Sequence, residues 1–67
     1  MKVKKLIKNL RIGQDVEIRE DNYFLCETRT DTTTIEVYKE REVIDWFAHC
    51  KRPSETFIVI NIKGEVE

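Results

Sequence analysis

The sequence predicts an α+β domain in which an N-terminal helix packs on an antiparallel sheet of four or five strands. Two observations predict it: a helical stripe of apolar residues at the start of the chain, and later short segments in which apolar and polar residues alternate. The chain has 67 residues, of which 40% are hydrophobic, two are Gly and one is Pro. We therefore expect a single folded domain, residues 1–67, with one small core.

The first predicted element is a helix over residues 2–11. Its apolar residues recur at i, i+3, i+4 and i+7, which places them on one helix face: Val3, Leu6, Ile7 and Leu10. Gly13 then ends the element, because glycine adopts a left-handed C-terminal conformation at the least cost.

Two strands joined by a turn are predicted next, over residues 15–19 and 23–28. In the first, Val16 and Ile18 alternate with charged residues, which is the period of a strand with one solvated face. The second is rich in residues that favour strands. The Asp-Asn pair at positions 21–22 is typical of a turn.

A third strand is predicted over residues 34–38, after a polar connection at 29–33. Ile35 and Val37 alternate there with polar neighbours. Together the three strands would form a meander.

Residues 42–50 fit a helix and a strand equally well, because their apolar residues match both periods. Val, Ile, Trp and Phe favour the strand, and no Ser, Thr, Asp or Asn immediately precedes the segment as a helix cap. We therefore predict a strand and keep a second helix over residues 40–51 as the alternative.

The last strand is predicted over residues 56–63, after a loop at 51–55 that holds the only proline. Gly64 ends it, and we expect residues 65–67 to fray. In the predicted core the helix stripe packs on nine residues of the sheet, which are Val16, Ile18, Leu25, Ile35, Val37, Ile44, Trp46, Ile58 and Ile60.

Three segments carry a family resemblance: the basic start MKVKKLIKNL, the short strand DVEIRE, and REVIDWF followed after a loop by FIVINIK. In these the chain resembles small, largely uncharacterised phage and prophage accessory proteins of Gram-positive bacteria. The group tends to pair a strand like REVIDW with a terminal aliphatic strand, which favours the strand at 42–47. The chain departs from the group between Tyr38 and Arg41, where the connection is too short for an additional turn or helix. The resemblance implies a viral accessory context and little about mechanism.

Charge is distributed unevenly along the chain. The first 11 residues hold five of the 12 basic side chains and no acid, whereas the rest holds seven basic and 13 acidic ones. Two surfaces of opposite sign could therefore each steer a charged partner.

We expect a non-enzymatic phage accessory factor that binds and modulates or inhibits a host protein, such as a host enzyme or defence complex. The candidate contact surface is an acidic face made of Glu17, Glu20, Asp21, Glu27, Glu36, Glu42 and Asp45. Such a face complements a basic groove and can imitate nucleic-acid phosphates. The alternative for these acids is that they only keep the sheet solvated.

Two further functions stay open. Nucleic acid could bind the basic residues of the N-terminal helix, which are Lys2, Lys4, Lys5, Lys8 and Arg11. An acidic body, a pI of about 5.8 and the lack of aromatic residues among the lysines weigh against this function. Self-association through Tyr38, Trp46 or Phe47, or through an unpaired strand edge, is the other alternative.

Catalysis has little support in the sequence, so we predict no enzyme, no catalytic residue and no cofactor. His49 is the only histidine, and Ser54 lacks the glycine-rich turn that presents a nucleophile. Cys26 and Cys50 are expected to be free, buried thiols, since nothing suggests a disulfide-dependent secreted domain. No metal is predicted, because adjacent His49 and Cys50 lack the spacing of zinc ligands. Without an apolar run of membrane-spanning length, we expect a cytoplasmic protein of a bacterial host that binds no membrane.

Overall fold

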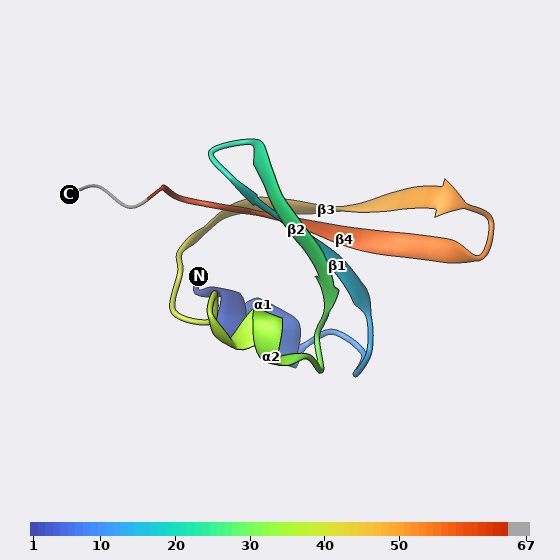
Figure 1. Cartoon of the computed structure of the whole chain (residues 1–67), viewed down its shortest axis with the longest axis horizontal. Coiled ribbons are helices and arrows are strands. Elements are labelled where there is room, and N and C mark those ends of the chain that lie inside the picture. The colour runs from blue at the N-terminus through green and yellow to red at the C-terminus, as the bar shows by residue number, and fades with distance from the viewer. Residues whose placement is uncertain (65–67) are drawn as a thin grey trace.

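The computed structural model of the protein describes residues 1–64, apart from the side chains at positions 51 and 52. The expected fraying of residues 65–67 lies outside the described chain. Two short helices accompany a four-stranded mixed sheet, in the order α1 (Val3–Lys8), β1 (Asp15–Glu20), β2 (Tyr23–Arg29), α2 (Thr33–Glu36), β3 (Val43–Arg52) and β4 (Glu55–Ile62) (Figure 1). The α+β class and a four-stranded sheet are therefore confirmed.

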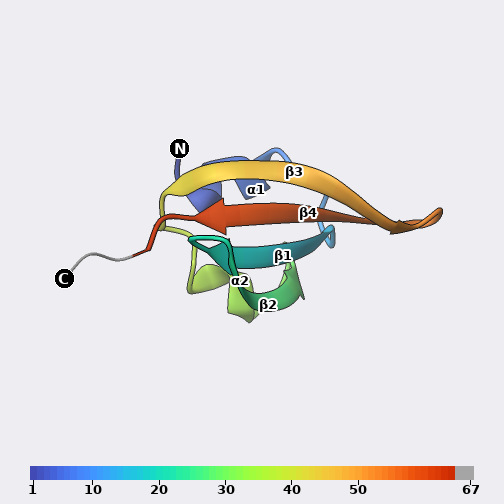
Figure 2. The ribbon, with the colours of Figure 1, turned by 90° about the horizontal axis from the view of Figure 1, so that it is seen from above.

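The helices lie on the same side of the sheet, which we call the inner face. Figure 2 looks onto the opposite side, where the strands stand between the viewer and the helices. We call this opposite side the outer face. Among the described residues, no helix lies on it.

The strand order is β2-β1-β4-β3. β1 pairs antiparallel with β2, and β3 pairs antiparallel with β4, but β1 and β4 run parallel. The prediction of an all-antiparallel sheet is therefore wrong. The last strand of the chain inserts between the first strand and the third instead of adding to the end of a meander.

The central place of β4 follows from its composition. Ile58, Ile60 and Ile62 belong to the main core, while Val59 and Asn61 between them are buried as well. Strands that are buried on both faces read as nearly continuous apolar runs instead of alternating ones. The run FIVINI at positions 57–62 has this character, and an edge position would have left half of it in water.

Residues 34–38 do not form the predicted strand. Their first part lies in the single helical turn α2, and Val37 is its C-cap. Ile35 is fully buried, whereas Val37 is 74% exposed. Successive helical residues are rotated by about 100°, so residues two apart face nearly opposite ways, unlike in a strand.

Residues 43–50 of this segment form a strand within β3, as favoured by their composition, while Glu42 precedes it. The alternative helix over residues 40–51 is wrong. The neighbouring β4 provides partners for Val43 and for residues 45–50, which local periodicity could not reveal.

One buried apolar cluster forms the core, made of Val3, Leu6, Val16, Ile18, Ile35, Ile58, Ile60 and Ile62. Four residues predicted for the core are instead exposed, namely Leu25, Val37, Ile44 and Trp46. Helix α1 is shorter than the predicted residues 2–11, although Ile7 and Leu10 still pack against the cluster. Leu25, Ile44 and Trp46 were predicted as buried strand residues from alternation. Alternation shows which residues share a face of a strand, but not which stretch of that face the helices cover.

The turn between β1 and β2 is hydrogen-bonded to a buried asparagine of β4, Asn61. Asp21 and Asn22 have φ values of 48° and 73°, the positive sign that a type I′ turn requires. The Asn22 amide N–H donates to Asn61 Oδ1 at 2.9 Å, and Asn61 Nδ2 donates to Asn22 Oδ1 at 3.1 Å. Because Asn61 belongs to β4, this pair ties the predicted turn at 21–22 to the centre of the sheet.

Replacing Asn61 by Ala should lower the free energy of unfolding by about 1 kcal/mol, because the turn loses both hydrogen bonds that Asn22 makes with the buried Asn61 side chain. Urea denaturation followed by circular dichroism measures the change. Asn9→Ala is the matched control, since Asn9 is exposed and should cost less than about 0.5 kcal/mol. Equal losses in the two variants would contradict the role assigned to Asn61.

Candidate protein-binding surface

Strand β3 forms one edge of the sheet. At its beginning the N-terminal segment covers this edge, because the Val43 N–H donates to Met1 O at 2.8 Å and Lys2 forms a single bridge with Glu42. From Ile44 to His49, no segment of the described chain pairs with the side of β3 that faces away from β4. We call this stretch, Ile44–His49, the β3 edge.

Three large apolar side chains are exposed along the β3 edge. Ile44 is 53% exposed, Trp46 47% and Phe47 46%. Trp46 lies opposite Ile60 and so points to the inner face, whereas Phe47 lies opposite Val59 on the outer face. The β3–β4 hairpin projects past the helices, at the right of Figure 1, so its distal part receives no cover from α1 or α2.

Phe47 is held in a defined place on the outer face. Its neighbour Val59 is only 1% exposed and lies between Phe47 and Glu17 in the strand register. Arg19 binds Glu17, with Nε 2.5 Å from Oε2, and its guanidinium lies 6.0 Å from the centre of the Phe47 ring. This arrangement fits a cation–π contact. It gives the half-exposed Phe47 ring a cationic neighbour on the outer face.

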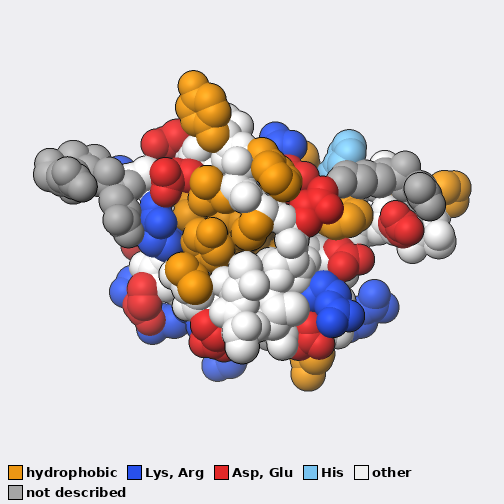
Figure 3. All heavy atoms as spheres, viewed as in Figure 1, with side chains coloured by type: hydrophobic (Ala, Val, Ile, Leu, Met, Phe, Trp, Pro, Cys, Tyr) orange, Lys and Arg blue, Asp and Glu red, His pale blue; other side chains and the backbone are white. Residues whose placement is uncertain are grey.

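The seven acids predicted to form one binding face are spread over the molecule. Glu17, Glu27 and Asp45 lie on the outer face, on three different strands. Glu20 and Asp21 lie at the β1–β2 turn, Glu36 lies on α2, and Glu42 precedes β3. On the side shown in Figure 3, acidic and basic side chains are interspersed around a group of hydrophobic ones.

Four of these acids form ion pairs within the chain. The pairs are Glu17 with Arg19, Glu20 with Arg41, Glu36 with Lys39, and Glu42 with the N-terminal amino group. Their charges are therefore matched locally, which weakens the field that they project toward a partner. Of the seven, Asp45 is the one on the β3 edge.

The basic N-terminal residues divide into two sets. Lys2 Nζ and Lys4 Nζ each lie 2.9 Å from a carboxylate oxygen of Glu40. Hydrogen bonds from Lys2 and then Lys4 lower the pKa of Glu40 to about 2, and the pair with Glu40 raises the pKa of Lys2. Lys5, Lys8 and Arg11 form no ion pair within the described part of the chain.

Backbone hydrogen bonds bring Glu40 to these lysines. The Val3 N–H donates to Arg41 O and the Lys4 N–H donates to Lys39 O, both at 3.0 Å. The connection between α2 and β3 thus runs alongside the first turn of α1. Helix α1 itself spans only Val3–Lys8.

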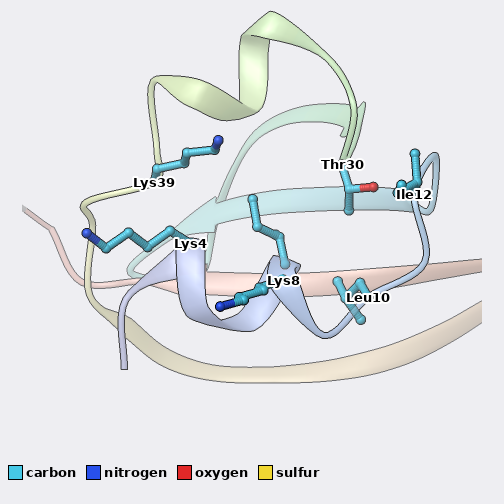
Figure 4. Close-up of a pocket in the computed structure, with 7 residues that line it drawn as sticks. Lys4, Lys8, Leu10, Ile12, Thr30 and Lys39 are labelled. Carbon is cyan, nitrogen blue, oxygen red and sulfur yellow. The ribbon is translucent and has the colours of Figure 1, made fainter.

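A hollow of about 360 Å³ lies beside α1 (Figure 4). Its lining consists of Lys4, Ile7, Lys8, Leu10, Ile12, Thr30 and Lys39. Two of the three lysine ammonium groups are already paired, Lys4 with Glu40 and Lys39 with Glu36. The hollow therefore combines an apolar lining with a rim whose charge is largely balanced.

Of the residues considered for chemistry, Cys26 lies on β2, whereas His49 and Cys50 are neighbours on β3 that face opposite sides of the sheet. Cys26 is half-buried against the core, whereas Cys50 is exposed, so the expectation of a buried thiol is wrong for Cys50. His49 is exposed on the outer face. Within residues 1–64, no group of three or more His, Cys, Asp or Glu side chains is placed to hold a metal ion.

Tyr38, Trp46 and Phe47 are the residues named for the alternative function, self-association. Trp46 and Phe47 are exposed on the β3 edge, but Tyr38 is half-buried and packs against the core, where burial and then the nearby Cys26 raise its pKa. Sequence reasoning missed Ile44 as an exposed residue and Arg19 as the group that lies over Phe47. The alternation at 15–19 predicts that Arg19 lies on the polar face of its strand. It does not predict that Phe47 of β3 lies next to Arg19.

No family model, no curated protein and no solved structure matches this chain. Neither helix of the described residues has the length and apolar character needed to cross a membrane.

Replacing Glu40 by Gln should destabilise the protein around pH 7 and leave its stability unchanged below pH 2. The pKa of Glu40 is lowered from 4.5 to about 2 in the folded chain, so its ion pairs stabilise the fold above about pH 4.5 and are lost as the pH falls toward 2. Thermal unfolding of both proteins across this range measures the difference.

High salt is the control for the Glu40 experiment. Because Glu40 is exposed, screening should shrink the difference around pH 7 as well. A difference that stays constant from neutral pH to below pH 2 would contradict the assigned pairs with Lys2 and Lys4.

Proposed function

We propose that this protein is a small protein-binding module that acts by occupying a partner's surface, without chemistry of its own. An extended segment of the partner adds to the sheet along the β3 edge. The observation that carries the proposal is an unpaired edge with three exposed apolar side chains, Ile44, Trp46 and Phe47. In strand addition, backbone hydrogen bonds supply affinity and alternating side chains supply specificity.

The regular geometry of the β3 edge supports this choice over the other edge strand. The β3–β4 register shifts at both ends, between Val43 and Asp45 and between Cys50 and Arg52, but residues Asp45–Cys50 pair with β4 without interruption. The β1–β2 register instead shifts in its middle, between Ile18 and Arg19. Such a bulge twists an edge and discourages pairing with another strand. Strand β2 is therefore the less suitable of the two edges.

The side chains of the β3 edge also favour binding. Natural proteins often protect an edge with Lys or Pro, and neither occurs from Val43 to Cys50. Trp46 and Phe47 are of the aromatic type that dominates contact energy in protein interfaces, and Arg19 already orders Phe47. Little ordering cost would remain for Phe47 when a partner binds.

The partner that we propose is a bacterial host protein, such as a host enzyme or defence complex, because the chain resembles phage accessory proteins. An acidic contact surface is the weaker form of this proposal, since four of its seven acids are paired within the chain. Nucleic-acid binding through the basic helix is weaker too, because Glu40 occupies Lys2 and Lys4.

Replacing Phe47 by Lys should abolish partner binding, because a charge replaces the ordered aromatic contact on the edge. Affinity capture from lysate of a Gram-positive host, followed by mass spectrometry, compares this variant with the unmodified protein. Phe24→Lys is the matched control: Phe24 is also an exposed phenylalanine on the outer face, but it lies on β2. Circular dichroism verifies that both variants fold.

A stoichiometric protein that is retained by the Phe24 variant, lost with the Phe47 variant and insensitive to nuclease would support the proposal. Equal loss in both variants would contradict the β3 edge as the contact. Capture that disappears with nuclease would overturn protein binding in favour of nucleic acid and the basic residues of α1.

A further inference from the structure

We infer that the β3 edge also takes a second copy of this chain, so that two β3 strands pair antiparallel across a two-fold axis at Phe47. The two four-stranded sheets would join into one continuous sheet of eight strands. The inference deepens the proposed function and rests on it, since it assumes that the β3 edge binds by strand addition.

Symmetry restricts the register of such a dimer. Two identical antiparallel strands in one sheet are related by a two-fold axis perpendicular to the sheet. Residues directly opposite each other in a sheet share a face, so the axis must pass through a residue that lies opposite its own copy. Within the regular stretch, the candidates for that residue are the five positions from Asp45 to His49.

Side-chain complementarity selects among these registers. An axis at Asp45 or at His49 places two carboxylates or two imidazoles face to face. An axis at Trp46 or Ala48 sets Phe47 opposite Asp45 or His49 of the second copy. With the axis at Phe47, each Asp45 lies opposite His49 of the second copy, and its carboxylate can accept a hydrogen bond from the imidazole N–H.

The apolar side chains also match in this register. On the outer face, the two Phe47 rings meet at the axis, each next to its own Arg19. On the inner face, Trp46 lies opposite Ala48 of the second copy, and the small methyl group leaves room for the indole ring. Cross-strand aromatic pairs of this kind stabilise sheets.

The backbone of the N-terminal segment meets β3 only before the paired residues. Met1 covers β3 only at Val43, where it accepts the backbone hydrogen bond. The pairs that define the register use residues 45–49, which begin two residues later. The short contact should give a reversible dimer instead of an obligate one, since stable interfaces bury about 800 Å² per partner.

The test is sedimentation velocity of the purified chain over a range of concentrations, comparing the unmodified protein with Asp45→His, His49→Asp and the double variant. The average mass of the unmodified protein should rise from 8.0 kDa toward twice that value. Each single variant puts two imidazoles or two carboxylates face to face at two places in the dimer. Each should therefore weaken association on the order of tenfold.

The double variant exchanges the two residues and restores both complementary pairs, so it should regain most of the lost association. This rescue is specific to an axis at Phe47, because no other register places positions 45 and 49 opposite each other. Phe47→Lys should abolish the dimer, while the control Phe24→Lys should leave it unchanged, with circular dichroism verifying the fold of every variant.

Three results would overturn the inference: a folded chain that stays at 8.0 kDa at all concentrations, single variants that associate like the unmodified protein, or a double variant that remains as weak as the single ones. The experiment contains no other protein, so it is independent of lysate capture. A monomer that still captures a host protein through Phe47 would leave the proposed function standing and remove only the dimer.

Discussion

The parallel pairing of β1 with β4 is the contact on which the rest of the structure depends. It sets Val16 and Ile18 beside Ile58 and Ile60, in the middle of the buried cluster. Residues 58–62 of β4 are all buried, on both faces of the sheet, and removing their apolar surface from water stabilises this central position. The central position of this pair leaves β2 and β3 as the two edges.

The exposed surface follows from this order. Once β4 lies between β1 and β3, the long hairpin extends past two helices that are too short to cover it. Trp46 and Phe47 stay partly in water although their residue types favour burial. The same arrangement brings Arg19 across the sheet to Phe47. The feature that we interpret as a binding edge is thus a direct consequence of how the core is filled.

The fold also brings residues of opposite charge together. Along the chain, basic residues gather at the start and acidic ones follow, which suggests two opposite surfaces. In the folded protein the connection before β3 runs beside α1, so Glu40 meets Lys2 and Lys4. Similar pairs engage Glu20 and Glu42. Surface pairs contribute little stability, but they cancel the fields that would draw a charged partner.

The sequence by itself determined the α+β class, the turn at Asp21 and Asn22, and the strands β1, β2 and β4, because these depend on local periodicity and turn chemistry. For β3 the periodicity fitted helix and strand equally, and only the composition favoured the strand. Only the tertiary structure decided the parallel pairing of β1 with β4, the helical turn at Ile35 and the hydrogen bonds between Asn61 and Asn22. Each depends on contacts between residues far apart in the chain. It also decided that Ile44, Trp46 and Phe47 are exposed. Phe47 lies on the outer face, where no helix of the described chain lies, and a pattern of apolar residues does not say which face of a sheet the helices cover.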